Sequence, residues 1–219
     1  MNNQKNLYAK LDFIGLRVSH NERLSKGEVP DIEHTLIEAC YEVDRDGRLL
    51  GLLFSWMMIH GDHLIADKFF KEYKNAKKYL GESPWFYALC AFRHHQKDHR
   101  FKKGLVKLKA PHYFGGPNQS SLIKLKGSVD YLQKLNIFVA PSSLRIRESD
   151  VLSQEELVKT NEQYRNRYIW GANWRAEIIG LIRKGAKTPG EIAKTLGLAR
   201  SRVGIVFKEY MMVKRFAVN

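Results

Sequence analysis

Cysteine is scarce in this sequence: the 219 residues contain only Cys40 and Cys90, and each lies in an apolar segment. We therefore predict two buried thiols in a reducing compartment and no disulfide framework. The first residues also lack the charged and then apolar pattern of a signal peptide. Together these absences predict a cytoplasmic protein.

Long apolar runs are absent as well. The most apolar stretch, residues 49–59, is 11 residues long, whereas a membrane-spanning helix needs about 20. This stretch therefore predicts a buried helix, and we expect no membrane partner. The sequence also contains no phosphate-binding P-loop, no dinucleotide fingerprint and no Ser-His-Asp or Cys-His arrangement that can be placed in a site. We accordingly expect neither enzymatic activity nor a cofactor.

Acidic residues are outnumbered by basic ones. The chain contains 37 Lys or Arg against 23 Asp or Glu, a formal net charge of +14, and its pI is near 9.7. Such an excess predicts a polyanionic partner, which could be DNA, RNA or an acidic membrane surface. Because hydrophobic residues make up 44% of the chain, a folded core is also expected. We favour nucleic acid as the partner of this folded protein.

Apolar residues that recur at three- and four-residue spacing predict a mainly α-helical fold. Four such stretches, separated by glycine or proline, predict a helical bundle over residues 31–108. Residues 110–120 predict a loop, and the short apolar runs in 121–127 and 137–149 could form strands, which gives minor β or irregular structure. We expect an N-terminal arm, a helical domain with a basic loop region, a connecting helix or linker, and a C-terminal tri-helical domain, at residues 1–30, 31–147, 148–163 and 164–219.

The C-terminal segment contains the sharpest local signals. Residues 188–191, TPGE, match a capping box, in which the threonine side chain and the glutamate side chain each accept a backbone N–H of the first turn. Gly197 supplies the backbone freedom for a tight turn. Three amphipathic helices are predicted around these signals, with apolar stripes at Trp174, Ile178, Leu181 and Ile182, then Ile192, Ala193 and Leu196, then Val203, Val206, Phe207 and Tyr210.

With the small Ala193, the turn glycine Gly197 and the apolar Val203 six residues later, this segment resembles the helix-turn-helix DNA-binding domains, especially the tri-helical, winged-helix-like type of bacterial regulators. The resemblance covers residues 170–212, and no family resemblance is found for residues 1–160. It implies that the second helix crosses the DNA backbone and that the third lies in the major groove. The DNA-contacting residues it implies are Lys187 and Thr188 at phosphates, Arg200, Ser201 and Arg202 at base edges, and Lys208 two turns further along.

Two features depart from the pattern of that family. Gly204 and Ile205 stand where longer polar side chains often read bases. Residues 213–218 could supply one strand at most, so we expect a reduced or absent wing.

Positive charge is concentrated in the same region, because residues 160–219 contain twelve Lys or Arg against four Glu. Arg165, Arg167 and Arg175 are candidates for phosphate contacts among aromatic residues, which could stack on bases but more often pack in a core. Two alternatives remain: a solvated charged face, and a tri-helical unit that docks onto another protein.

A second basic patch precedes the predicted loop and consists of Lys97, Arg100, Lys102, Lys103, Lys107 and Lys109. It could contact a nucleic-acid backbone or could be a solvated surface. Histidines are dense in this part of the chain, so a metal site is conceivable, although no metalloenzyme motif accompanies them and we predict no metal. The residues concerned are His60, Asp62, His63, His94, His95, Asp98 and His99.

The sequence therefore predicts a DNA-binding protein, in particular a sequence-specific prokaryotic or mobile-element regulator of transcription. Its partner would be double-stranded DNA, and its N-terminal domain could form a homodimer or bind a protein. One alternative is a replication-initiation or RNA-binding protein that uses both basic patches. The other is a metal-dependent nucleic-acid hydrolase with a His/Asp site.

Overall fold

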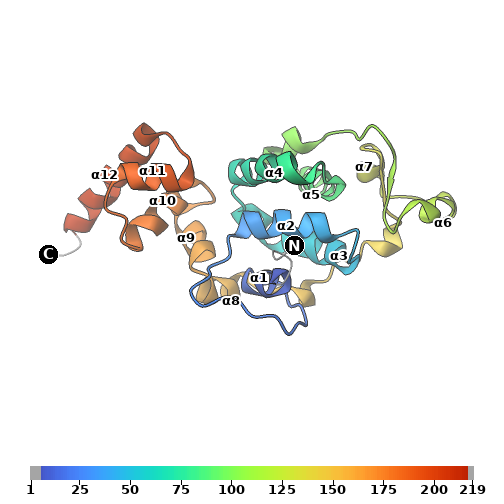
Figure 1. Ribbon diagram of the computed structural model, residues 1–219, viewed down its shortest axis with the longest axis horizontal. Helices are drawn as coiled ribbons and strands as arrows, with labels where there is room; N and C mark the ends of the chain where they lie inside the picture. The colour runs from blue at the N-terminus through green and yellow to red at the C-terminus, as the bar shows by residue number, and fades with distance from the viewer. Residues whose placement is uncertain (1–5, 217–219) are drawn as a thin grey trace. The chain divides into compact units, whose positions relative to one another are not determined.

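A computed structural model describes residues 6–216 of the chain, and it is mostly helical, which confirms the predicted mainly α fold (Figure 1). The chain divides into two compact units, residues 1–156 and 157–219, called unit 1 and unit 2 below. Each unit is described by itself.

Four helices form the centre of unit 1: α2 (Ile32–Glu42), α3 (Arg48–His60), α4 (Ala66–Leu80) and α5 (Pro84–His95). They are the four helices predicted from the apolar spacing. The side chain of Asp31 caps α2 by accepting the backbone N–H of His34 at 3.1 Å, and Pro84 occupies the first turn of α5. The strongly apolar α3 supplies much of the core, including Leu53, Phe54 and Trp56.

Aromatic rings and both thiols complete this core. The rings of Tyr73 and Phe86 stack with centroids 3.6 Å apart, and Phe101 is fully buried. Cys40 and Cys90 are buried and free, as predicted. Burial raises the pKa of both thiols, so each stays protonated and packs as a small apolar side chain.

The segment predicted as an N-terminal arm instead contributes a helix to unit 1. Helix α1 (Leu7–Phe13) buries Leu7 and Leu11, and Ile14 follows them into the core. The indole N–H of Trp56 donates to the carbonyl oxygen of Ile14 at 2.8 Å. The apolar residues at 7, 11 and 14 follow helical spacing, but the polar residues around them obscured this short period.

The rest of unit 1 is built from short elements. Strands β1 (His112–Tyr113) and β2 (Ile137–Phe138) form a two-stranded parallel pair. The predicted strand at 121–127 is wrong, because α6 (Ser120–Lys126) is a helix that buries Ile123 and leaves Leu125 exposed. The remaining elements are η1 (Gly61–His63), η2 (His99–Gly104), η3 (Pro117–Gln119), α7 (Asp130–Gln133), η4 (Pro141–Ser143) and η5 (Glu148–Asp150).

In the described residues of unit 2, all secondary structure is helical. Helix α8 (Gln154–Thr160) spans the boundary, and α9 (Glu162–Trp170), α10 (Trp174–Arg183), α11 (Pro189–Leu196) and α12 (Arg200–Phe216) follow (Figure 1). The last three share one core. Its buried members are the predicted ones, Ile178, Ile182, Ile192, Ala193 and Val203, with Leu181, Leu196, Leu198, Val206, Phe207 and Tyr210 packed around them.

Helix α12 extends further than the sequence predicted. Residues 213–216, expected to contribute to one strand of a wing at most, continue the helix, and residues 217 and 218 of that prediction lie outside the described residues. No glycine or proline interrupts residues 205–216, and Met, Lys and Arg favour helix, so no local signal ends α12 earlier.

Candidate nucleic-acid interface

The start of α11 is fixed by a cap that its own sequence encodes. The hydroxyl oxygen of Thr188 accepts the backbone N–H of Glu191 at 3.2 Å, as predicted for the capping box. The Glu191 carboxylate accepts the N–H of Lys187 at 3.1 Å, one residue before the predicted partner. Pro189 occupies the first turn, where its missing N–H costs nothing.

The turn from α11 to α12 depends on Gly197. Its backbone is left-handed, with φ 58° and ψ 46°, a region where side chains other than glycine are strained. The next N–H, of Leu198, donates to the carbonyl oxygen of Ala193 at 3.0 Å. This closed turn brings Ala193 and Val203 into the same core and starts α12 at Arg200.

The residues assigned to DNA on α12 lie on its solvent side. Arg200, Ser201, Arg202 and Lys208 are exposed, whereas Val203 between them is buried. The guanidinium of Arg200 extends to the first turn of α11, where its Nε lies 4.0 Å from the position that a Cβ on Gly190 would occupy. The structure therefore brings Arg200 close to the capped start of α11, which carries Lys187 and Thr188.

All four side-chain carboxylates of unit 2 are engaged within the unit. On the α9–α10 side, Glu162 pairs with Lys184 at 3.6 Å and Glu177 pairs with Arg167 at 2.8 Å. Glu191 holds the cap of α11, and Glu209 of α12 pairs with Arg175 of α10 at 2.6 Å.

The cations of α11 and α12 are left without such compensation. Within residues 157–214, the exposed side chains of seven cations make no ion pair or hydrogen bond with the described chain. Lys194 was counted in the charge of this segment but not assigned to the site. It lies within α11, on the exposed side of the helix. Six of the seven lie just before α11 or on α11 and α12, and the seventh, Lys159, lies on α8; the six are Lys187, Lys194, Arg200, Arg202, Lys208 and Lys214.

Three arginines predicted to hold phosphates are used for other contacts. Arg167 is completely buried beside Glu177, so it cannot reach a phosphate. Arg175 pairs with Glu209, and Arg165 lies against the carbonyl oxygens of Val158 and Lys159 at 3.4 and 3.5 Å. Trp174 is buried and continues the core stripe of α10. It therefore packs in a core, which was one of the two roles considered for these aromatic residues, and does not stack on bases.

In the second basic patch, two of the six cations are paired with carboxylates and four are exposed without such a partner in the described chain. Lys97, Lys102, Lys107 and Lys109 are exposed. Lys103 instead pairs with Asp67 at 3.1 Å and lies over the ring of Phe70, 4.2 Å from its centroid.

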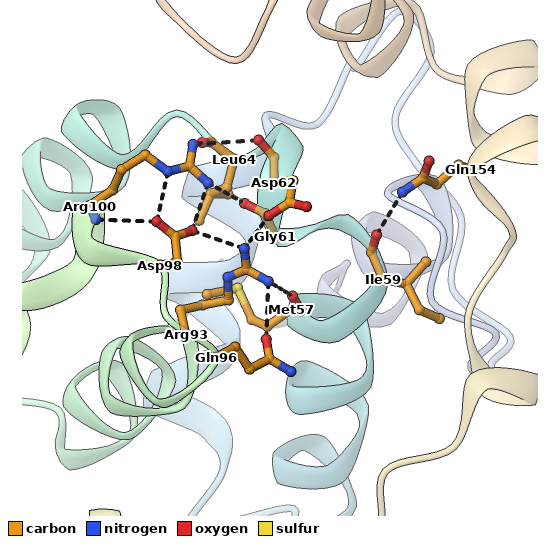
Figure 2. Close-up of polar contacts among 10 residues, drawn as sticks. All are labelled: Met57, Ile59, Gly61, Asp62, Leu64, Arg93, Gln96, Asp98, Arg100 and Gln154. Atoms are coloured by element: carbon orange, nitrogen blue, oxygen red, sulfur yellow. Dashed lines mark hydrogen bonds and ion pairs between the residues drawn. The ribbon is translucent and has the colours of Figure 1, made fainter.

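Arg100, the other member, belongs to a polar network that joins α3, α5 and η2 (Figure 2). It binds Asp98 at 2.7 Å and donates to the carbonyl oxygen of Leu64 at 3.1 Å. Arg93, only 6% exposed at its side chain, pairs with Asp98 at 2.9 Å and with Asp62, and donates to the carbonyl oxygen of Met57. Arg100 therefore has contacts within unit 1, unlike the four exposed lysines of the patch.

The histidines that are dense in the sequence do not form one site, although the rings of His94 and His99 meet edge to face with centroids 5.6 Å apart. His60 is buried with its Nε2 2.9 Å from the carbonyl oxygen of Leu152, and burial lowers the pKa of His60 to about 4. Helix α5 ends at His95, which stacks on Tyr131, so His95 and His99 do not share a helix face. Across residues 6–216, no group of three or more His, Cys, Asp or Glu side chains could hold a metal ion.

No protein-family model, curated protein or solved structure matches the chain. Within residues 6–216, no helix combines the length and the apolar character that crossing a membrane requires.

Asp98→Asn tests the network in unit 1. Burial alone would raise the pKa of Asp98, but hydrogen bonds from Arg100 and Arg93 outweigh it and lower the pKa to about 2. A lowered carboxylate pKa stabilises the folded state above the unfolded pKa near 4, and this contribution is lost as pH falls toward 2. We expect the substitution to cost about 2–4 kcal/mol in urea unfolding at pH 7 and progressively less below pH 4.

Asp67→Asn is the matched control, because Asp67 and its partner Lys103 are both exposed. It should change the free energy of unfolding by less than about 1 kcal/mol. Equal effects of the two substitutions at pH 7 would contradict the structural role of Asp98.

Thr188→Ala tests the cap of α11. Loss of the hydroxyl leaves the N–H of Glu191 without its acceptor, and we expect about 1 kcal/mol less protection of α11 and α12 amides in native-state hydrogen exchange. Thr195→Ala is the control in the same helix, because its hydroxyl only donates back to the carbonyl oxygen of Glu191. Unchanged protection in Thr188→Ala would show that the cap does not hold the helix.

Proposed function

We propose that the chain binds double-stranded DNA through α11 and α12, as a sequence-specific regulator of prokaryotic or mobile-element type. One observation carries this proposal: of the seven exposed cations that remain uncompensated in the described part of unit 2, six lie just before α11 or on α11 and α12. Acidic groups that would repel phosphate are held by Lys184, Arg167, Arg175 and the cap of α11. A polyanion is the partner that such a surface favours.

The turn geometry supports a division of roles between the two helices. Lys187, just before α11, and Lys194 on α11 would contact phosphates and set the register of the protein on the duplex. Arg200, Ser201 and Arg202 form the exposed first turn of α12, the part of a recognition helix that reaches base edges. An arginine there can donate two hydrogen bonds to guanine O6 and N7, which carries sequence information that phosphate contacts lack.

Arg200→Ala and Arg202→Ala test base reading directly. The preferred duplex is first selected from a random pool with the full chain, and the spacing of its half-sites also reports whether two copies bind. Each substitution should weaken binding to that duplex by about 1–3 kcal/mol. Binding to random duplex should weaken less, because there each substitution removes only the electrostatic attraction of the arginine to phosphates.

Arg45→Ala is the matched control, since Arg45 is an exposed arginine of unit 1 outside both basic surfaces. It should leave both affinities unchanged within about twofold. Equal losses on preferred and random DNA in the α12 variants would defeat the assignment of Arg200 and Arg202 to bases.

RNA binding through both units is the second candidate. It is supported by the exposed lysines Lys97, Lys102 and Lys107 of unit 1, which add positive charge outside α11 and α12. A replication-initiation protein could use the same two surfaces on DNA.

Competition separates these candidates. We expect unlabelled duplex DNA to displace a bound duplex at lower concentration than RNA of the same length, because the exposed first turn of α12 fits the wide major groove of B-DNA and not the narrow one of an RNA helix. The triple substitution Lys97→Ala, Lys102→Ala and Lys107→Ala should then reduce duplex affinity less than Arg200→Ala does. Tighter competition by RNA, or the reverse order of the variants, would favour the second candidate.

A further inference from the structure

We propose that Ile205 recognises the 5-methyl group of a thymine in the major groove, and that Gly204 keeps the helix surface beside it bare. This inference rests on the proposed function and names the base that the centre of α12 contacts. It also accounts for the two positions at which the chain departs from the helix-turn-helix pattern.

Ile205 lies in the middle of the solvent-facing stripe of α12. Ser201, Ile205, Lys208 and Met212 follow one another at four- and three-residue spacing, so they share one face of the helix. All four are exposed, and Ile205 is 61% exposed. Val203, on the opposite side, is buried in the core of unit 2. The stripe that would enter a groove therefore has an isoleucine at its centre.

Gly204 has no structural reason to be glycine within the described chain. It lies inside α12, where glycine is less favourable than alanine, and its backbone does not adopt positive φ. A Cβ at this position would meet no atom within 4 Å. Glycine is also used where a ligand must approach the backbone closely. We infer that the open surface at Gly204 serves such an approach.

Charge around the stripe selects DNA as its occupant. Arg200, Arg202 and Lys208 surround Ile205 without a carboxylate partner, and Glu209, the one acidic residue of α12, is paired with Arg175. An apolar protein surface would leave these cations unsatisfied. The major groove offers phosphates along both edges and, at each thymine, an apolar methyl group at its floor.

Replacement of thymine by deoxyuridine tests the contact, because the two bases differ only by the methyl group. In the duplex selected by the full chain, each thymine is replaced in turn. The unsubstituted protein should lose about three- to fivefold in affinity at one thymine for each bound copy. Ile205→Ala should bind the thymine duplex with a similar loss and should be insensitive to deoxyuridine at that position. Gly204→Ala should weaken binding by at least threefold, although its melting temperature should not fall.

Val213→Ala is the matched control, since Val213 is an equally exposed aliphatic residue of α12 away from the stripe. It should keep the thymine preference. Duplex binding in which Ile205→Ala retains that preference, or a selected pool with no fixed thymine, would overturn the inference and leave DNA binding intact. Absence of any duplex binding at low salt would overturn both proposals. A change of oligomeric mass in Ile205→Ala with unchanged thymine preference would assign the stripe to a second copy and also overturn the inference.

Discussion

Charge compensation inside unit 2 determines what its surface can do. The unit has only four side-chain carboxylates. Two of them, Glu177 and Glu209, form ion pairs with Arg167 of α9 and Arg175 of α10. The exposed pair Arg175–Glu209 contributes little to stability. Its consequence is electrostatic, because it neutralises the one acidic residue of α12. The exposed cations of α12 then face solvent without an ion-pair partner in the described chain.

Local chemistry explains why unit 2 could be predicted well. The cap at Thr188, the left-handed Gly197 and the stripe around Val203 each depend on residues close in sequence, and each is found where the sequence indicated. Ion pairing could not be predicted in this way. Arg175 meets Glu209, 34 positions away, only because α10 packs against α12. Arg167 was for the same reason assigned to DNA, although it is buried.

Unit 1 shows the same limit at shorter range. Helix α5 ends at His95, and Lys97 adopts a positive φ of 68°. That turn brings Asp98 back to Arg93 and Arg100, and it pairs Arg100 with a carboxylate that its place in the basic run did not indicate. In α1, the apolar residues were too few for their period to be recognised among polar neighbours. The pairing of Asp98 with both arginines is a tertiary effect, which composition and spacing do not encode.

The salt dependence of duplex binding tests the central claim most directly, because it counts the cations that phosphates neutralise. The logarithm of the association constant of the full chain for a duplex is measured against the logarithm of the salt concentration. The six uncompensated cations at α11 and α12 predict a slope of about −5. A slope near zero, or no duplex binding at low salt, would show that the cations of α11 and α12 do not meet DNA phosphates.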